Sequence, residues 1–511
     1  MAGSSFTDPQ DLARLAARGI TPEEATRQLE VMARPAAWAR LERPCTVGDG
    51  IERLDEARVD ALLAVHATAA RAGRVSAFIP ASGAATRMFK DLLAARDLAG
   101  DLAPAALRAG TDAASRAVVR FVDELPRFAF AQALADVLDR RGHALDALRS
   151  QGPWRPILDA FFDADGLGAA HAPKGLLLFH HEAGESRTAF EEQLIEAVPL
   201  TNDGSETRAL EVTVSPEHRA GFEQVLATRT RALAECFGGR WAVVFSEQHP
   251  STDTLAGDPA GGAFRDEHGE LLFRPAGHGA LLHNLAVSGR DLVFLKNIDN
   301  LGVSRLKPET YRWSRALVGL AAELSDAARV LVRRLRGGDA VAVGAAREFA
   351  SRTLGLELPA TLDAAALATA LDRPVRVCGM VANTGEPGGG PFWVRGADGV
   401  TRQIVESAQV DPASSEQQAI LKAATHFNPV FLACALRSAD GTPHDLARFV
   451  DDAAVIVTRK SHGGRELLAL ERPGLWNGAM AHWHTCFVEV PLAVFNPVKT
   501  VFDLLRPEHQ A

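Results

Sequence analysis

The sequence predicts an α/β protein with a doubly wound sheet and helical additions, and three observations predict it. Short apolar or β-branched runs of strand length recur along the chain, at residues 75–79, 175–179, 211–215, 241–245, 271–273 and 292–295. Helical stretches such as 190–197 and 216–236 lie between several of these runs, and this alternation is typical of a sheet covered by helices. The chain has 511 residues, which is long enough to bury large cores without disulfides or metals.

The remaining segments are mostly helical. Asp8-Pro9 begins a helix that ends at Gly19, and Thr21-Pro22 begins a second, because Ser, Thr and Asp caps followed by Pro favour a helix start. Residues 51–72 and the amphipathic run 115–125 are also helical in pattern. Further strands are expected at 375–381, 455–458 and 487–495, and a glycine loop at 388–390. We expect four parts: a helical cap (1–72), an α/β core (73–305) with a helical insertion (91–165), a helical subdomain (306–373) and a C-terminal part of the core (374–511).

Composition excludes several classes of protein. Hydrophobic residues make up 47% and charged residues 23%, as in soluble globular proteins. The net charge of −9 argues against nucleic acid and anionic membranes as partners. No apolar run reaches the roughly 18 residues of a membrane span, and the N-terminal residues resemble no secretory signal. The five cysteines are scattered without a C-x-x-C pair, so we expect a cytoplasmic protein without disulfides.

The first candidate motif is the loop of small residues that follows the strand at 75–79. It reads Pro-Ala-Ser-Gly-Ala-Ala-Thr-Arg from Pro80 to Arg87. Backbone N–H groups in such a loop can approach phosphates, and Arg87 adds a bidentate donor. A tight turn capped by Thr86 explains the same residues. Lys174, just ahead of the run at 175–179, places an ammonium at a sheet edge or in solvent.

The second candidate motif surrounds the strand at 292–295. That strand is followed by Asn297-Ile298-Asp299-Asn300, and a carboxylate at the carboxyl end of a strand suits ligand binding and Mg²⁺. The alternative is a helix cap. Upstream, Gly277-His278-Gly279 brings bare backbone and an imidazole together, which suits either a base or sugar contact or a turn.

Two later motifs complete the candidate residues. Residues 378–393 hold five glycines around Asn383 and Glu386, followed by two aromatic residues, which favours a carbohydrate-contact loop over a wide hairpin. Lys499 and Asp503 lie four residues apart, as in the first turn of a helix with a solvated ion pair or in a charged site. His180-His181-Glu182 and His482-Trp483-His484 have no third ligand at a diagnostic spacing, so we expect no dedicated zinc site.

These motifs carry a resemblance to a known family. Pro275-x-Gly277-His278-Gly279, Asn297-x-Asp299-Asn300-Leu301-Gly302 and Phe495-x-Pro497-Val498-Lys499 with Asp503-Leu504-Leu505 resemble, in this order, the UTP–sugar-1-phosphate uridylyltransferases (UDP-sugar pyrophosphorylases). Ala81 to Met88 resembles the nucleotidyltransferase loop A-G-G-x-G-T-R-M, and Pro173-Lys174 resembles its P-K element. The whole chain also resembles the uncharacterised bacterial family domain of unknown function 4301.

The resemblance implies a GT-A-like nucleotidyltransferase fold and a reaction between an NTP, expected to be UTP, and a sugar 1-phosphate. Arg87 would bind the leaving pyrophosphate, Lys174 the α-phosphate region and Lys499 the sugar phosphate, with Mg²⁺ on Asp299 and Asp503 as a second ligand or an orienter of Lys499. The remaining implied contacts, with nucleotide, base or sugar, are Ser82, Gly83, Ala84, Thr86, Gly277, His278, Gly279, Asn297, Asn383 and Glu386.

Two departures from the family keep alternatives open. Ser82 and Ala85 replace glycines of the family's loop, and about 85 residues separate Arg87 from Lys174 where the family has a short link. A GT-A glycosyltransferase and a non-catalytic nucleotide-sugar-binding protein therefore remain alternatives. The catalytic interpretation predicts that Arg87, Lys174, Asp299 and Lys499 converge within about 10–15 Å, with strands at 75–79 and from Gly175 in one sheet. The sequence indicates no particular oligomeric state.

Overall fold

The structure is a computed structural model that describes residues 6–34, 37–83, 85–98, 100–201, 204, 207–385, 388–396 and 399–511. The chain forms two compact units. Unit 1 contains Met1–Phe78, Ser246–Leu295 and Ser314–Pro491, and unit 2 contains Ile79–Phe245, Lys296–Trp313 and Leu492–Ala511. Each unit thus draws on three separate segments, whereas the sequence analysis expects four consecutive parts. Among the described residues, no helix has both the length and the apolar character needed to cross a membrane.

Unit 1 contains most of the strands. Its strands are β1 (Leu41–Pro44), β2 (Thr46–Val47), β3 (Gly50–Glu52), β4 (Val75–Pro80, up to Phe78), β9 (Thr254–Gly257), β10 (Phe273–Arg274), β11 (Leu292–Lys296, up to Leu295), β12 (Val375–Ala382), β13 (Gly390–Gly396), β14 (Gly399–Val405), β15 (His426–Phe427), β16 (Phe431–Ala435), β17 (Ile456–His462), β18 (Arg465–Glu471) and β19 (His484–Glu489). Its helices are α1 (Pro9–Arg18), α2 (Pro22–Ala33), α3 (Glu56–Arg71), α12 (Leu281–Val287), α13 (Lys307–Arg336, from Ser314), α14 (Ala340–Glu348), α15 (Ala364–Leu371) and α16 (Ser415–Lys422).

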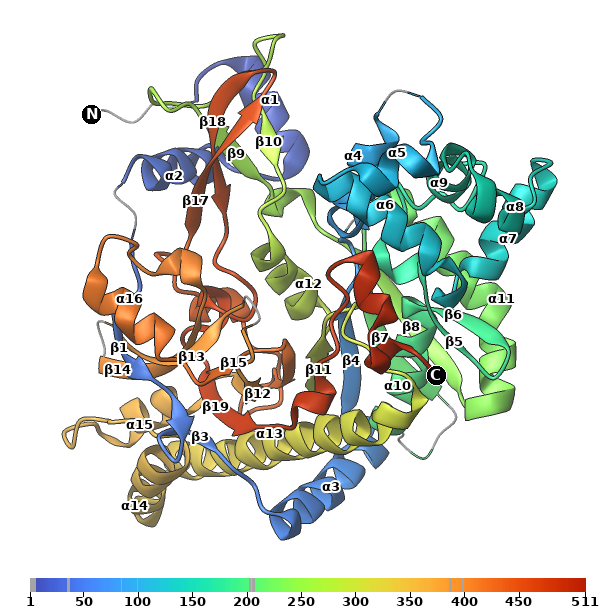
Figure 1. Ribbon diagram of the computed structural model, residues 1–511. Coiled ribbons are helices and arrows are strands. Elements are labelled where there is room, and N and C mark those ends of the chain that lie inside the picture. Colours follow the sequence, from blue (N-terminus) through green and yellow to red (C-terminus); the bar gives the residue numbers. More distant parts are fainter. Residues whose placement is uncertain are drawn as a thin grey trace. The chain divides into compact units, whose positions relative to one another are not determined.

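The main sheet of unit 1 has the order β2-β3-β19-β12-β16-β11-β4, with β15 added beside β12. The β11–β4 pair is parallel, with Leu292 opposite Val75 and Leu295 opposite Phe78, and β12–β19 is also parallel. Because β12–β16 is antiparallel, the sheet is mixed. In Figure 1 the long helix α13 runs below the lower ends of β12 and β19. The predicted α/β class is confirmed.

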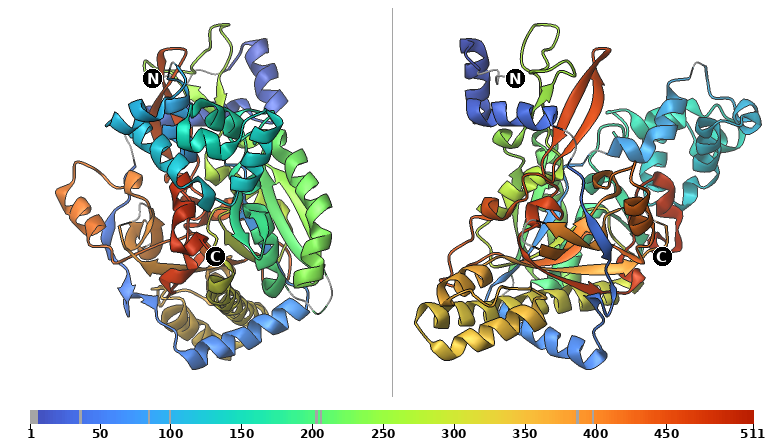
Figure 2. Two further views of the ribbon diagram at one scale, coloured as in Figure 1. Left: turned by 45° about the vertical axis from the view of Figure 1, so that its right-hand side comes forward. Right: turned by 90° about the vertical axis from the view of Figure 1, so that its left-hand side faces the viewer.

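Two smaller sheets of unit 1 account for strands that the sequence places in the core. The order β10-β9-β18-β17 forms a four-stranded sheet, and β1-β13-β14 forms a three-stranded sheet. Figure 2 shows β17 and β18 as a long hairpin beside α1 and α2. The runs at 271–273 and 455–458 therefore correspond to β10 and β17 outside the main sheet, because an apolar run predicts a strand and not its partners.

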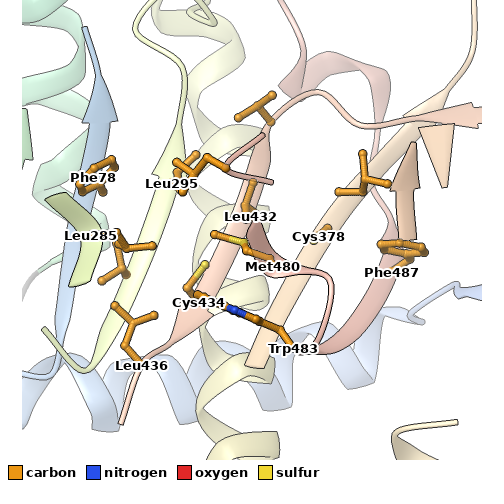
Figure 3. Packing of buried hydrophobic residues seen from close by; sticks show 14 of the residues in the cluster. Phe78, Leu285, Leu295, Cys378, Leu432, Cys434, Leu436, Met480, Trp483 and Phe487 are labelled. Atoms are coloured by element: carbon orange, nitrogen blue, oxygen red, sulfur yellow. The ribbon is translucent and has the colours of Figure 1, made fainter. Parts of the chain in front are cut away.

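Apolar side chains from the main sheet and its helices form the largest core described in unit 1. Figure 3 shows residues far apart in the sequence packed together, from β4, α12, β11, β12, β16 and β19. Phe78, Leu285, Leu432 and Phe487 are all nearly inaccessible to solvent. Burying side chains of this size stabilises a fold by about 1.5–3 kcal/mol each, so this core holds the ends of β4 and β11 in place.

Unit 2 contains the helical insertion and a smaller set of strands. Its helices are α4 (Lys90–Arg96), α5 (Pro104–Ala109), α6 (Ala113–Asp123), α7 (Ala131–Arg140), α8 (Leu145–Gln151), α9 (Arg155–Phe162), α10 (Ala189–Leu200) and α11 (Arg219–Phe237). Its strands are β5 (Leu178–Glu182), β6 (Glu185–Thr188), β7 (Thr207–Val214) and β8 (Arg240–Glu247). Strand β7 is hydrogen-bonded to β8 and follows β4, whose last residues Ile79 and Pro80 belong to unit 2. Helices α4 to α9 occupy the segment 91–165 for which the sequence predicts a helical insertion.

The structure corrects the expected strand that begins at Gly175. Residues Lys174–Leu176 form a 3₁₀ turn (η3), and β5 pairs with β6 in a two-stranded sheet. The sheet membership that the sequence predicts for this segment is therefore wrong. Gly175 lies so close to Phe222 that an added Cβ would be 2.6 Å from the ring, so helix α11 packs against this turn.

Local capping explains where the helices begin. Asp8 Oδ1 accepts a hydrogen bond from the N–H of Gln10 at 2.8 Å, and Gly19 ends α1 at φ +71°. Thr21 caps α2 through the N–H of Glu24. Both helices begin at the residues that the sequence predicts. The expected helix at 51–72 begins only at Glu56, because Asp55 caps it and Ile51 belongs to β3.

Candidate functional site

The loop of small residues after β4 lies in unit 2 and presents an exposed edge. The N–H of Ala81 donates to the carbonyl of Thr213 on β7 at 2.9 Å, which fixes the loop's entry. Gly83, Thr86 and Arg87 are exposed, and a short 3₁₀ helix begins at Ala85 (η1, Ala85–Phe89). A Cβ added to Gly83 would contact nothing within 4 Å, so this glycine leaves open space beside the backbone. Ala84, a predicted contact, lies outside the described residues.

Two backbone hydrogen bonds join this loop to the segment that carries Lys174. The N–H of Ala85 donates to the carbonyl of Ala172 at 3.3 Å, and the N–H of Lys174 donates to the carbonyl of Gly83 at 3.4 Å. The chain therefore enters the helical insertion just after this loop, and it returns to the loop where the insertion ends. The insertion does not separate Lys174 from the loop, although about 85 residues lie between them in sequence.

Asp299 lies at the centre of the charged cluster in unit 2. It follows β11 in a turn in which the N–H of Asn300 donates to the carbonyl of Asn297 at 3.2 Å. Its carboxylate is 6% exposed as a residue, and its Oδ2 accepts a hydrogen bond from Lys174 Nζ at 2.6 Å. Lys499 Nζ is 3.7 Å from the same oxygen. Two ammonium groups thus share one buried carboxylate. Their positive charges compensate the negative charge of Asp299, whose burial would otherwise cost free energy.

The C-terminal segment reaches Asp299 because it runs alongside the chain that follows β11. The N–H of Leu301 donates to the carbonyl of Asn496 at 3.2 Å, and the N–H of Val498 donates to the carbonyl of Asp299 at 3.1 Å. Lys174 Nζ also donates to the carbonyl of Val498 at 2.7 Å. Lys174 is therefore tied to protein groups on two sides, and its side chain is 15% exposed. Lys499 is 54% exposed and is the ammonium that a ligand can reach.

Asp503 has a different environment from Asp299. Its Oδ2 accepts hydrogen bonds from the N–H groups of Lys499 and Thr500, at 2.8 and 2.7 Å. Its Oδ1 lies 2.8 Å from an Arg506 nitrogen. Asp503 therefore caps the 3₁₀ helix η13 (Val501–Leu505) and holds the backbone of Lys499. Both carboxylate oxygens are engaged, so this geometry fits an orienter of Lys499 and not a metal ligand.

The donor set of the cluster can be tested against a magnesium ion. Among the residues that the structure describes, no three His, Cys, Asp or Glu side chains gather as a complete metal site. Mg²⁺ commonly takes one or two carboxylates and completes its shell with water and substrate phosphates. Asp299 fits that pattern, because in the described part of the chain its Oδ1 has no hydrogen-bond donor.

A buried ionic network in unit 2 supports this cluster and was missed by sequence reasoning. Glu192 on α10 is fully buried and contacts Lys307, Arg187 and His180. Burial alone would raise the pKa of Glu192, but the interactions with Lys307, His180 and Arg187 outweigh it and hold the pKa well below its usual range. Gln193, the next residue, donates through Nε2 to the carbonyl of Asn297 at 3.1 Å. Helix α10 thus holds the turn that carries Asp299.

A histidine pair joins this network to the C-terminus. His180 Nε2 lies 3.0 Å from His509 Nδ1, and both imidazoles are buried. Burial lowers the pKa of His509 to about 3, and the neighbouring His180 acts in the same direction while Asp299 opposes it. Figure 1 shows the red C-terminal segment beside the β5–β6 hairpin that carries His180. The sequence signal for this network is the run of glutamates within the apolar pattern of α10.

The Gly277-His278-Gly279 motif lies in unit 1, where backbone contacts require its glycines. Gly277 has φ +73°, and a Cβ on Gly279 would lie 2.2 Å from the carbonyl oxygen of Pro473. The His278 ring stacks on Trp476 with centroids 4.1 Å apart and an angle of 14°. Its Nδ1 accepts a hydrogen bond from the N–H of Leu475 at 3.0 Å. The turn is therefore packed against residues 472–476.

The chemistry of His278 follows from this packing. Burial lowers its pKa to about 4, so the imidazole is neutral at pH 7. Because Nδ1 accepts a hydrogen bond, Nε2 carries the proton and can donate it to a ligand oxygen. Glu406 Oε1 lies 3.9 Å from Nε2, and burial raises the pKa of Glu406. Asn477 is almost fully buried beside Glu406, and its Oδ1 has no partner among the described residues.

Glu406 and Asn477 were not candidates from the sequence, because neither lies in a spaced motif. The signal available was the run Gln403-Ile404-Val405-Glu406, a strand that ends in a carboxylate. The predicted carbohydrate loop is described only in part. Asn383 is exposed, and its Oδ1 accepts a hydrogen bond from the N–H of Gly385 at 2.9 Å, while Glu386 lies outside the described residues.

The predicted candidate residues thus divide between the two units. Unit 2 brings together Lys174, Asp299, Lys499 and Asp503, with Asn297 in the same turn and Ser82, Gly83 and Thr86 in the joined loop. Unit 1 holds Gly277, His278, Gly279 and Asn383. Arg87 is exposed in unit 2, one residue after Thr86. The two histidine clusters form no metal site within the described residues, and His484 is instead buried with its Nε2 3.1 Å from the carbonyl of Leu371.

Comparisons with known proteins place this arrangement in context. Residues 8–510 match the family described as Domain of unknown function (DUF4301). No curated protein matches the chain. Solved structures similar to this chain include a variant of UDP-glucose pyrophosphorylase from Leishmania major, with 14% identity, a TM-score of 0.46, and coverage of 97% of this chain and 77% of that one. Another is the uridine diphosphate N-acetylglucosamine pyrophosphorylase from Trypanosoma brucei, with 13% identity, a TM-score of 0.49, and coverage of 98% and 80%.

Proposed function

We propose that this chain, which belongs to the family described as Domain of unknown function (DUF4301), is a nucleotidyltransferase. The proposed reaction joins an NTP, with UTP favoured by the motifs, to a sugar 1-phosphate and releases pyrophosphate. The observation that carries the proposal is the convergence of Lys174 and Lys499 on Asp299, beside the loop at 81–87. Several phosphates must be neutralised in one place for this reaction, and a cluster of ammonium groups at an exposed loop can do so.

The reaction needs positioning more than covalent chemistry by the protein. An oxygen of the sugar phosphate attacks the α-phosphorus in line, a new P–O bond forms, and the bond to the leaving pyrophosphate breaks. We assign the sugar phosphate to Lys499, because its side chain is half exposed while its backbone is held by Asp503. Lys174, whose Nζ is tied to Asp299 and Val498, orients the cluster next to the α-phosphate. Arg87, exposed on the loop, would bind the leaving pyrophosphate.

Magnesium is the proposed cofactor, held by Asp299 together with the nucleotide phosphates. When bound it would neutralise phosphate charge and orient the phosphate oxygens. Asp503 is not assigned to it, because its two oxygens bind the backbone of residues 499–500 and Arg506.

The Gly277–Gly279 turn and Asn383, which belong to unit 1, stay predicted contacts of the base or the sugar. A neutral His278 with a proton on Nε2 can donate to a carbonyl or hydroxyl oxygen, and bare glycine backbone permits close approach. Gly279 itself is needed for packing against Pro473. Glu386 remains a predicted sugar contact.

One observation favours a second candidate, a protein that binds a nucleotide-sugar without turnover. The N–H of Ala85 donates to the carbonyl of Ala172, so one of the loop's N–H groups is committed to the protein and not free for phosphate. Fewer free N–H groups leave a weaker cradle for a triphosphate. A GT-A glycosyltransferase has no observation of its own in its favour.

The deciding experiment is a matrix of the four NTPs against a panel of sugar 1-phosphates, with Mg²⁺, read by pyrophosphate release. Pyrophosphate formation that needs both substrates is the expected result, and it should be lost in Lys499→Ala but kept in Lys422→Ala, an exposed lysine of α16 in unit 1. Nucleotide-sugar binding by calorimetry without pyrophosphate release from any pair would instead establish the binding protein. Sugar transfer to an acceptor without pyrophosphate would establish the glycosyltransferase.

A further inference from the structure

The backbone that carries Lys499 is held at its far end by the helical insertion. We call residues 496–510 the C-terminal arm. The carbonyl of Leu505, in the last turn of η13, accepts a hydrogen bond from Arg127 Nη2 at 2.9 Å. Arg127 ends the short 3₁₀ helix η2 (Leu125–Arg127), which follows α6 of the insertion. The arm and the insertion both belong to unit 2.

Two further contacts strengthen this attachment. Gln510 Nε2 donates to the carbonyl of Arg127 at 3.2 Å and to that of Leu504 at 2.7 Å. The guanidinium of Arg120 on α6 lies 4.5 Å from the ring centre of Phe502, which is a favourable cation–π distance. Carbonyls at the end of a helix have no partner within the helix, so Arg127 and Gln510 together satisfy the C-terminal end of η13.

The short helix η13 connects the Leu505 carbonyl, which Arg127 binds, to the backbone of Lys499. At the other end of η13, Asp503 accepts hydrogen bonds from the N–H groups of Lys499 and Thr500. A 3₁₀ helix rises about 2.0 Å per residue, so the Leu505 carbonyl and the Lys499 backbone are two ends of a single capped turn. A shift at Leu505 therefore moves the Lys499 ammonium, which is only 3.7 Å from Asp299.

We propose that Arg127 is a positioning residue for Lys499, through which the helical insertion sets the place of that ammonium at Asp299. The inference rests on the proposed function, in which Lys499 acts on the sugar phosphate. In this role the helical insertion takes part in the reaction by holding the C-terminal arm in place. Arg127 does not touch substrate in this role.

The kinetic test compares Arg127→Ala with Arg127→Lys. A misplacement of about 1 Å can cost up to about 10²-fold in rate, so we expect kcat to fall about 10-fold or more in Arg127→Ala while the KM for the NTP stays within about 2-fold. Arg127→Lys keeps a donor for the Leu505 carbonyl and should recover most of the loss. The matched control is Arg108→Ala, which removes an arginine of the insertion that pairs with Asp123 and lies over the Trp154 ring, with no contact to the arm among the described residues.

A double variant separates positioning from a general loss of structure. If Arg127 acts through Lys499, adding Arg127→Ala to Lys499→Ala should change the residual rate by less than about 2-fold. Rate losses that multiply, or an equal loss in Arg108→Ala, would overturn the proposal. If Arg127→Ala does not fold, Gln510→Ala weakens the same attachment and should give a smaller loss with the same dependence on Lys499.

A measurement without turnover distinguishes this inference from the proposed function. The chain has only seven lysines, so acylation of each by an amine-reactive ester can be followed by peptide mass spectrometry. An ammonium fixed beside a carboxylate moves less freely towards the reagent than a released one, and we expect the Lys499 rate, relative to Lys422, to rise several-fold in Arg127→Ala but not in Arg108→Ala. Unchanged Lys499 labelling contradicts the positioning role. Changed labelling in a protein that turns over no substrate pair supports it while the proposed reaction fails.

Discussion

Lys174 Nζ lies 2.6 Å from Asp299 Oδ2, although 125 residues separate the two in sequence. Two pairs of adjacent segments bring these two side chains together. The segment with Lys174 is tied by backbone hydrogen bonds to the loop after β4, and Asp299 follows β11, the parallel neighbour of β4. The C-terminal arm adds Lys499 to the same oxygen. Three remote parts of the chain thus supply one charged cluster.

Lys499→Ala should lower turnover by about 10²–10³-fold, because a charged donor to the reacting phosphate is lost. Its side chain is half exposed and its backbone is held by Asp503, so folding should be preserved. Steady-state rates of pyrophosphate release measure the effect, with Lys422→Ala as the control. A Lys499→Ala rate near that of the wild type would remove this residue from the reaction.

Asp299→Asn should abolish Mg²⁺-dependent activity, since a neutral amide is a poor ligand for a hard divalent cation. It also leaves Lys174 and Lys499 without their shared counter-charge. Calorimetric titration of Mg²⁺ in the presence of nucleotide measures the metal site directly. An affinity equal to that of the wild type would place the metal elsewhere. Asp503→Asn, whose parent carboxylate binds backbone N–H groups, is the comparison and should leave that affinity unchanged.

Glu192→Gln should lower the free energy of unfolding of unit 2 by about 3–5 kcal/mol, because it leaves Lys307 buried without its counter-charge and Arg187 with Glu182 as its remaining carboxylate. Urea denaturation followed by circular dichroism, with hydrogen exchange to locate the affected unit, measures it. Glu466→Gln removes an exposed partner of Arg459 and should change stability by less than about 1 kcal/mol. Equal effects of the two substitutions would mean that the buried network contributes little.

His484 should make unit 1 less stable in mild acid. Burial lowers its folded-state pKa to about 4, whereas an unfolded histidine titrates near about 6.5. Between these two pH values the unfolded state binds a proton that the folded state does not bind. The free energy of unfolding therefore falls as pH falls from about 6.5 towards 4, by about 2 kcal/mol at pH 5. Urea midpoints across this range measure it, and His484→Gln, which keeps a donor towards Leu371, should flatten the curve. An identical curve in both proteins would refute the assignment.

Gly279→Ala should destabilise unit 1 by roughly 1–3 kcal/mol, because the new Cβ would lie 2.2 Å from the Pro473 carbonyl oxygen and the backbone must shift. Thermal unfolding measures the loss. Gly344→Ala is the control, since no atom lies within 4 Å of its added Cβ in helix α14 and alanine is the better helix former. An unchanged thermal unfolding temperature in Gly279→Ala would show that residues 472–476 can move to make room for the new Cβ.

Much of the local structure could be predicted from the sequence. The caps at Asp8 and Thr21, the strands at 75–79 and 292–295 and the helical insertion all depend on residues close to one another in the chain. The strand from Gly175 is assigned to the wrong sheet, because residues 174–176 form a 3₁₀ turn and β5 pairs with β6. A short apolar run shows that a segment is buried, but carries no information about its neighbour.

The candidate site divides in the same way. The sequence by itself determined the residue types of the cluster, since a lysine, an aspartate and a second lysine stand in motifs short enough to recognise. Only the tertiary structure decided that Lys174 is tied to Val498 and that Glu192 is buried among cations. The physical reason is distance along the chain. Capping and propensity act between residues a few positions apart, whereas charge pairing in a low-dielectric interior depends on which remote segments the fold packs together.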